Sequence, residues 1–282
     1  MILRREAHFL GHQSCELFYQ TWSDENPRAT LVVTHGMAEH SECYQRLAEA
    51  MVPRGWELIA WDLRGHGRSE GQRGYVGNFR EFSEDLALFV GHLGQQLKLK
   101  KPFALLGHSM GGLITLLTVM EHGLLGAKAV ALSSPLLGIA LPVPAIKDFI
   151  ARSLERLIPR LTLYNEIRYE DLSHDQTIVE SYRKDALRHE KIAPTLYLGM
   201  LEAMSRAQKQ AAQLTAPILI QSAGQDRIVS LEETKHLFAN LGSQDKTHLI
   251  YQQSFHEIFN DLEREKVYND LHTHLCRILG LS

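Results

Sequence analysis

A serine stands in the middle of a glycine-flanked stretch, Gly107-His-Ser-Met-Gly111. An apolar run from Phe103 to Leu106 precedes it and apolar residues at helical spacing follow it, which predicts a strand, a sharp turn and a helix. So tight a turn strains the backbone of its central residue, and the residues two before and two after must lack side chains. Ser109 would then project from the helix N-terminus, where main-chain N–H groups favour negative charge on a bound carbonyl oxygen. The pattern predicts that Ser109 is a nucleophile.

A serine hydroxyl needs a histidine to take its proton and an acid to orient that histidine. Of the 15 histidines, His256 lies in a loop beyond the last predicted strand. Asp226 likewise follows a predicted strand, whereas most other acids after Ser109 lie on helices or in the long segment after Pro135. Packing or surface roles are expected for four histidines within predicted elements or beside the serine: His108, His236, His248 and His272. The chain order of serine, aspartate and histidine matches a hydrolase built on a parallel sheet, so Ser109, Asp226 and His256 are predicted to form a catalytic triad.

The elements that must position these residues alternate between strands and helices. Continuous apolar runs typical of buried parallel strands occupy 29–34, 56–61, 103–107, 127–132, 216–221 and 247–252. Helical spacing occupies 44–51, 82–97, 231–240 and 264–279. The sequence therefore predicts an α/β fold with a mostly parallel central sheet and helices on both faces. Residues 8–20 alternate in polarity, as an antiparallel hairpin at one edge of the sheet would.

This alternation breaks after Pro135 for roughly eighty residues, long enough for an inserted unit. We expect residues 1–135 and 216–282 to form the hydrolase core and residues 136–215 a helical cap, or lid. The cap carries apolar residues on one predicted helix face: Ile146, Phe149, Ile150, Leu154, Leu157 and Ile158. Cations surround them: Lys147, Arg152, Arg156 and Arg160. Such a stripe usually packs on the rest of the protein, but it can also make transient contact with a membrane surface.

The composition limits the kinds of protein to which this chain can belong. With 44% apolar and 22% charged residues and a formal charge of −3, the chain is typical of globular proteins and carries no basic signature of nucleic-acid binding. The three cysteines are scattered and predict neither a disulfide framework nor a thiolate zinc site, and no stretch suits an export signal, so a cytoplasmic protein is expected. His272 and His274 would point to different helix faces, and no glycine-rich phosphate loop occurs, so we expect no metal and no cofactor. The oligomeric state stays open.

Several motifs together resemble the α/β-hydrolase superfamily, and within it the monoacylglycerol lipase and lysophospholipase group of the serine aminopeptidase S33 type. The resemblance spans nearly the whole chain and rests on five motifs: His35-Gly-Met-Ala-Glu-His40, Asp62-Leu-Arg-Gly-His-Gly-Arg-Ser69, Gly107-His-Ser-Met-Gly-Gly112, Gly224-Gln-Asp226 and Phe255-His256. It implies an α/β-hydrolase fold and an oxyanion hole formed by the backbone N–H groups of Met37 and Met110. It also implies that Glu39 and His40 lie beside the alcohol end of the substrate.

Two positions depart from the best-known monoglyceride hydrolases. Cys43 stands where those enzymes carry an arginine, and Phe259 where they carry a second histidine. The stretch from His256 to Asn260 looks more like bacterial lysophospholipase-type members. The sequence therefore predicts a serine hydrolase of lipid-like monoesters, monoacylglycerol or lysophospholipid, with the head group left open. A small-ester esterase or aminopeptidase remains the alternative, and a non-catalytic binding protein is a further one.

Overall fold

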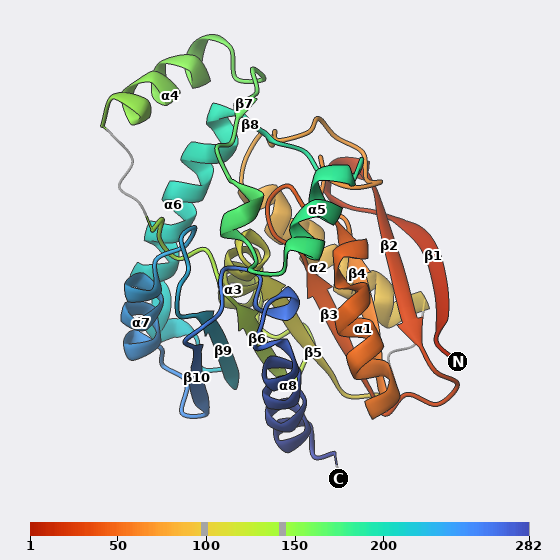
Figure 1. The fold of residues 1–282 in the computed structure, drawn as a ribbon. Helices are drawn as coiled ribbons and strands as arrows, with labels where there is room; N and C mark the ends of the chain where they lie inside the picture. The colour runs from red at the N-terminus through yellow and green to blue at the C-terminus, as the bar shows by residue number, and fades with distance from the viewer. Residues whose placement is uncertain (97–100, 141–144, 282) are drawn as a thin grey trace.

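The computed structural model describes residues 1–96, 101–140 and 145–281, with the backbone alone for residue 96 and residues 145–149. Within them, eight strands form one sheet in the order β1-β2-β4-β3-β5-β6-β9-β10 (Figure 1). Their bounds are β1 (Leu3–Leu10), β2 (Glu16–Ser23), β3 (Ala29–Thr34), β4 (Trp56–Trp61), β5 (Phe103–His108), β6 (Ala129–Ser133), β9 (Ile218–Ala223) and β10 (Lys246–Tyr251). From β4 to β10 all neighbours are parallel, and β1 and β2 form an antiparallel hairpin at the edge. Both features confirm the predicted sheet.

Helices cover both faces of this sheet, which explains the buried, mostly apolar runs of its central strands, such as β3 and β5. Along β3, Leu31 and Val33 belong to one core cluster and Val32 to the other, because successive side chains point to opposite faces. On the first face lie α1 (Gln45–Met51) and α8 (Arg264–Leu279) (Figure 1). The second face is covered by α2 (Arg80–Gln96), α3 (Met110–His122), α6 (Pro194–Gln210) and α7 (Leu231–Asn240).

Several element boundaries differ by one or two residues from those predicted, and two of them have a clear local reason. The strand predicted at 216–221 begins at Ile218, since Pro217 has no N–H to donate to the ladder. The helix predicted from Phe82 begins at Arg80, because Asn78 accepts a bond from the Arg80 N–H while Glu81 accepts one from the Asn78 N–H. The predicted C-terminal residue of this helix, Leu97, lies outside the described residues.

A long inserted segment connects β6 to β9. It contains α4 (Ala145–Leu157), α5 (Gln176–Lys184), α6 and the two-residue strands β7 (Leu163–Tyr164) and β8 (Lys191–Ile192), which pair with each other and which the sequence did not indicate. Helix α6 packs against α3, and Leu196 and Met200 are buried in the core of the sheet. Helix α4 packs on α6 at the far end of the molecule (Figure 1). No helix in the described parts of the chain is long and apolar enough to cross a membrane.

The start of helix α3 approaches strand β3 more closely than any side chain would allow. A Cβ atom on Gly111 would lie 2.2 Å from the carbonyl oxygen of Thr34 and 2.3 Å from that of His35. A Cβ on Gly107 would lie 2.4 Å from the carbonyl oxygen of Gly111. Both glycines are therefore required by packing, as the sequence predicted for the residues two before and two after Ser109.

This packing predicts a large cost for Gly111→Ala. The added methyl would collide with rigid backbone, so we expect a loss of about 3 kcal/mol in the free energy of unfolding, measured by urea denaturation. Gly94→Ala is the matched control, since Gly94 lies in helix α2 and a Cβ added there would have open space around it. That variant should gain about 0.5–1 kcal/mol. Equal stabilities of the two variants would contradict the close approach.

Candidate active site

Ser109 occupies a strained position between β5 and α3. Its φ of 52° and ψ of −121° lie in a region that non-glycine residues rarely adopt. The turn is held on both sides, because the Ser109 N–H donates to the Ser133 carbonyl at 3.0 Å and the Ser109 carbonyl accepts from the Leu136 N–H at 2.9 Å. Such strain is maintained where it places a side chain for chemistry, which agrees with the predicted nucleophile turn.

His256 and Asp226 are joined by a buried hydrogen bond. His256 Nδ1 lies 2.8 Å from Asp226 Oδ2, and the two side chains are 4% and 2% exposed. The other carboxylate oxygen, Oδ1, accepts bonds from the N–H groups of Ile228 and Val229, both at 2.9 Å. A carboxylate held in this way accepts the hydrogen on His256 Nδ1 and leaves Nε2 with a free lone pair. The pair can therefore serve as an oriented general base.

The serine and the histidine of this pair open into one cavity of about 770 Å³. Ser109 and His256 both line it, together with Met37 and Glu39. The ring of His256 also lies against the ring of His108, with centroids 4.9 Å apart, so the histidine sits beside the end of β5 from which Ser109 projects. The structure thus brings together the three residues predicted from the sequence as a triad.

The amide of Met37 lies in the loop after β3, and the amide of Met110 directly follows Ser109. Met110 is the first residue of α3, and Met37 follows β3 next to Ala38, whose φ of 65° turns the loop. In the described chain, neither N–H donates to a main-chain carbonyl. These two groups are accordingly available to an oxyanion beside Ser109.

The loop after β3 is fixed by the loop after β4. The Leu63 N–H donates to His35 Nε2 at 3.0 Å, so His35 carries its hydrogen on Nδ1 and donates it to the Gly36 carbonyl at 2.7 Å. Burial lowers the pKa of His35, which favours this neutral form. The carboxylate of Asp62 accepts from the N–H groups of Ser41 and Arg68, at 2.6 and 2.7 Å. The loop after β4 therefore fixes the loop after β3 at His35 and Ser41, before and after Met37 in the chain.

Glu39 brings a buried negative charge to the wall of the cavity. Its side chain accepts a bond from the Tyr44 hydroxyl at 3.2 Å and lies 3.4 Å from His108 Nε2. Burial acts to raise the pKa of Glu39, but the charges of His108 and Arg188 outweigh it, so the pKa lies well below its ordinary value. Glu39 is therefore ionised, whereas His40, its neighbour in the sequence, turns its ring toward Asp185 and does not line the cavity.

Arg188 and Glu257 also line the cavity, although no sequence pattern pointed to either. The guanidinium of Arg188 is 3% exposed, lies 3.3 Å from Glu257 and stacks over the ring of Tyr182 at 3.7 Å. Its Nε is buried without a hydrogen-bond partner in the described chain. Glu257 could have been suspected from its place beside His256, but Arg188 comes from the inserted segment, where no motif marks it.

Comparisons with known proteins identify relatives of this chain. A family model described as serine aminopeptidase, S33, matches residues 25–263. A monoacylglycerol lipase of Mycolicibacterium smegmatis is 31% identical over 95% of this chain and 95% of its own, and phospholipase YtpA of Bacillus subtilis is 28% identical over 88% of this chain and 95% of its own. The crystal structure of a Paleococcus ferrophilus monoacylglycerol lipase superposes with a TM-score of 0.82 at 27% identity over the full length of both chains.

The site predicts that Ser109→Ala lowers ester hydrolysis by about 10⁶-fold, because the three residues act as a unit. Asp226→Asn should lower it by about 10⁴-fold, since the histidine would lose its oriented tautomer. Initial rates on an aryl ester measure both losses. Ser134→Ala is the control, since its hydroxyl is also buried but has no hydrogen-bond partner among the described residues, and it should keep near-normal rates. A Ser109→Ala protein that still hydrolyses ester and reacts with a fluorophosphonate would refute the assignment.

Proposed function

Because the chain belongs to the serine aminopeptidase S33 family of α/β-hydrolases, we propose that it hydrolyses lipid-like carboxylic monoesters through an acyl-enzyme on Ser109. One observation supports this most: Ser109 and His256, which is bonded to Asp226, open into a cavity with largely apolar walls from the inserted segment. Its size lies within the range of small-molecule sites. The monoacylglycerol lipase and phospholipase among the relatives point to the same substrate class.

The chemistry follows from the free lone pair on His256 Nε2. The Ser109 hydroxyl attacks the acyl carbon while His256 takes its proton, and Asp226 stabilises the imidazolium. The negative charge on the carbonyl oxygen is bound by the N–H groups of Met37 and Met110. When the C–O bond to the alcohol breaks, His256 returns the proton to the leaving oxygen. A water then attacks the Ser109 ester by the same steps and releases the fatty acid.

We assign the acyl chain to the part of the cavity that the inserted segment covers. Residues 136–215 act as the cap, and aliphatic side chains from it line the cavity: Ile139, Ile150, Leu154, Leu163, Ile167, Leu172 and Ile192. Burial of an acyl chain there contributes at most ~0.8 kcal/mol per methylene. This binding energy lowers the barrier to hydrolysis when the acyl chain stays bound while the ester carbonyl reacts.

The alcohol part of the ester would lie at the polar wall formed by Glu39 and Arg188. An ionised carboxylate accepts hydrogen bonds from hydroxyl groups, and a guanidinium donates them. His40 would act on this wall indirectly, because its bond to Asp185 holds the loop that carries Glu39. The description of the family as aminopeptidases makes aminoacyl amides the appropriate competing substrates.

The cap also supports the proposal of transient contact with a membrane surface. The end of α4 and the residues after it expose Leu157 (77%), Ile158 (52%) and Tyr164 (58%). The exposed side chains of Arg156 and Arg160 lie among them and can approach anionic lipid. Of the stripe predicted from the sequence, the side chains of Ile146, Lys147 and Phe149 lie outside the described residues.

The acyl assignment predicts that catalytic efficiency rises with chain length. From four to twelve acyl carbons, kcat/KM on monoacylglycerols should rise steeply. The gain in transition-state binding energy is limited to about 6 kcal/mol for the eight added methylenes. The kcat/KM on monoacylglycerols should also exceed that on aminoacyl anilides. Leu154→Asp should flatten the profile, because Leu154 lines the cavity. Leu157→Asp, three residues later and exposed, should keep it. A flat or falling profile for the wild-type protein would contradict the proposal.

The membrane proposal predicts that the protein sediments with anionic liposomes. Leu157→Asp should reduce the bound fraction several-fold, since it places a charge at the lipid-facing surface. Leu10→Asp is the control, because Leu10 is 65% exposed on the edge strand β1, which pairs with β2 and not with the inserted segment. Absence of the wild-type protein from the pellet would rule out the contact.

A further inference from the structure

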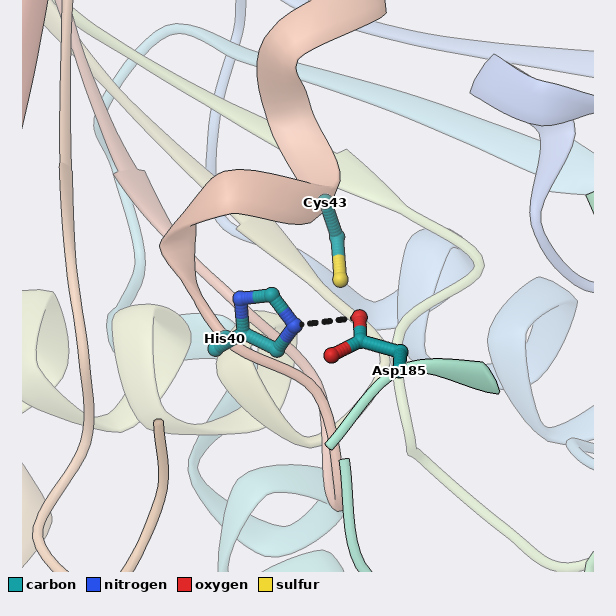
Figure 2. Close-up of side chains that lie close together, drawn as sticks. All are labelled: His40, Cys43 and Asp185. Carbon is teal, nitrogen blue, oxygen red and sulfur yellow. Dashed lines mark hydrogen bonds and ion pairs between the residues drawn. The ribbon is translucent and has the colours of Figure 1, made fainter. Parts of the chain in front are cut away.

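Three side chains with metal-binding atoms converge outside the candidate triad. His40 Nε2, Cys43 Sγ and a carboxylate oxygen of Asp185 all lie within 4.8 Å of one another (Figure 2). His40 and Cys43 belong to the turn that leads into α1, whereas Asp185 follows α5 in the inserted segment. The group therefore joins two parts of the chain that are 145 residues apart.

The surrounding contacts orient the metal-binding atoms of the three side chains toward one another. The Cys43 N–H donates to the His40 carbonyl at 3.2 Å, and this single turn places both side chains on the same side. Asp185 accepts a bond from the Leu187 N–H on Oδ1 at 2.9 Å, which leaves Oδ2 facing His40 Nε2 at 2.7 Å. A Cβ atom on Gly67 would lie 2.8 Å from the Cβ of His40, so close backbone packing holds the histidine.

The three atoms are a nitrogen, a sulfur and an oxygen, a combination that suits zinc rather than magnesium or calcium. With His40 and Asp185 as an ion pair and Cys43 as a thiol, the three side chains together carry no net charge. A divalent ion that displaces one proton from His40 and one from Cys43 leaves this net charge unchanged. The side chain of Asp185 is 27% exposed, which gives an ion a way in from solvent. Three protein ligands leave one tetrahedral position for water.

We propose that His40, Cys43 and Asp185 form a binding site for a thiophilic divalent cation of the zinc class. On binding, the ion takes the place of the hydrogen between His40 and Asp185 and of the thiol hydrogen, and the nitrogen and oxygen move apart to admit it. A further N–H group, Nη2 of Arg188, donates to Cys43 Sγ at 3.4 Å. The bound ion fastens the inserted segment to the loop that carries Glu39.

The test is a titration of the full-length, reduced protein with ZnCl₂ by calorimetry, and with CoCl₂ by absorption spectroscopy. We expect one ion per chain and a cobalt–thiolate charge-transfer band. Cys43→Ser and Asp185→Asn should each lower the zinc affinity at least about ten-fold, and Cys43→Ser should abolish the band. The matched control is Cys276→Ser, which removes the sulfur that lies 3.7 Å from His272 Nδ1 and should change neither result.

A second measurement on the wild-type protein does not depend on the folding of a variant. Zinc should slow the alkylation of Cys43 by iodoacetamide, followed by peptide mass spectrometry, and should leave Cys276 unprotected. Binding seen only at millimolar zinc, a band that survives Cys43→Ser, or protection of Cys276 instead of Cys43 would overturn the proposal. None of these readouts uses ester hydrolysis, so they remain valid whatever the substrate of Ser109.

Discussion

The architecture of the site depends on one close contact, between the first turn of α3 and the end of β3. Gly111 lies against the carbonyl oxygens of Thr34 and His35 at a distance that excludes any side chain. This contact is what allows the chain to turn from β5 into α3 within one residue, and it forces Ser109 to a positive φ. The same approach sets the loop after β3 beside the helix N-terminus. The strained serine and the neighbouring free amides are therefore consequences of one packing constraint.

The parallel sheet supplies the other groups at the same edge. Met37 follows β3, Ser109 follows β5, Asp226 follows β9 and His256 follows β10, and the carboxyl ends of parallel strands lie together. Each loop is then fixed by its own hydrogen bonds, as the two amides on Asp226 show. The inserted segment leaves from β6 between these strands, so its apolar side chains line the cavity that contains Ser109 and His256.

Much of this could be predicted from the sequence, because the signals were local. Apolar runs indicated the parallel strands, and the glycines around Ser109 indicated the turn. The tie between His40 and Asp185 was not predictable, since it joins residues 145 positions apart and Asp185 lies in a segment without periodic spacing. Arg188 was missed for the same reason. The charge of Arg188 is balanced by Glu257, which lies beside it only in the folded chain. A lone arginine in a charged stretch is usually on the surface. Strands β7 and β8 are two residues long, too short for any alternation to appear.

The proposed hydrolysis passes through an ester of Ser109. The most direct measurement is rapid acid quenching during turnover of a long-chain aryl monoester, followed by intact-protein and peptide mass spectrometry. We expect a burst of one acyl group per chain, located on the peptide that contains Ser109. Product formation without a burst or an acyl adduct, or an adduct on another residue such as Cys43, would contradict it.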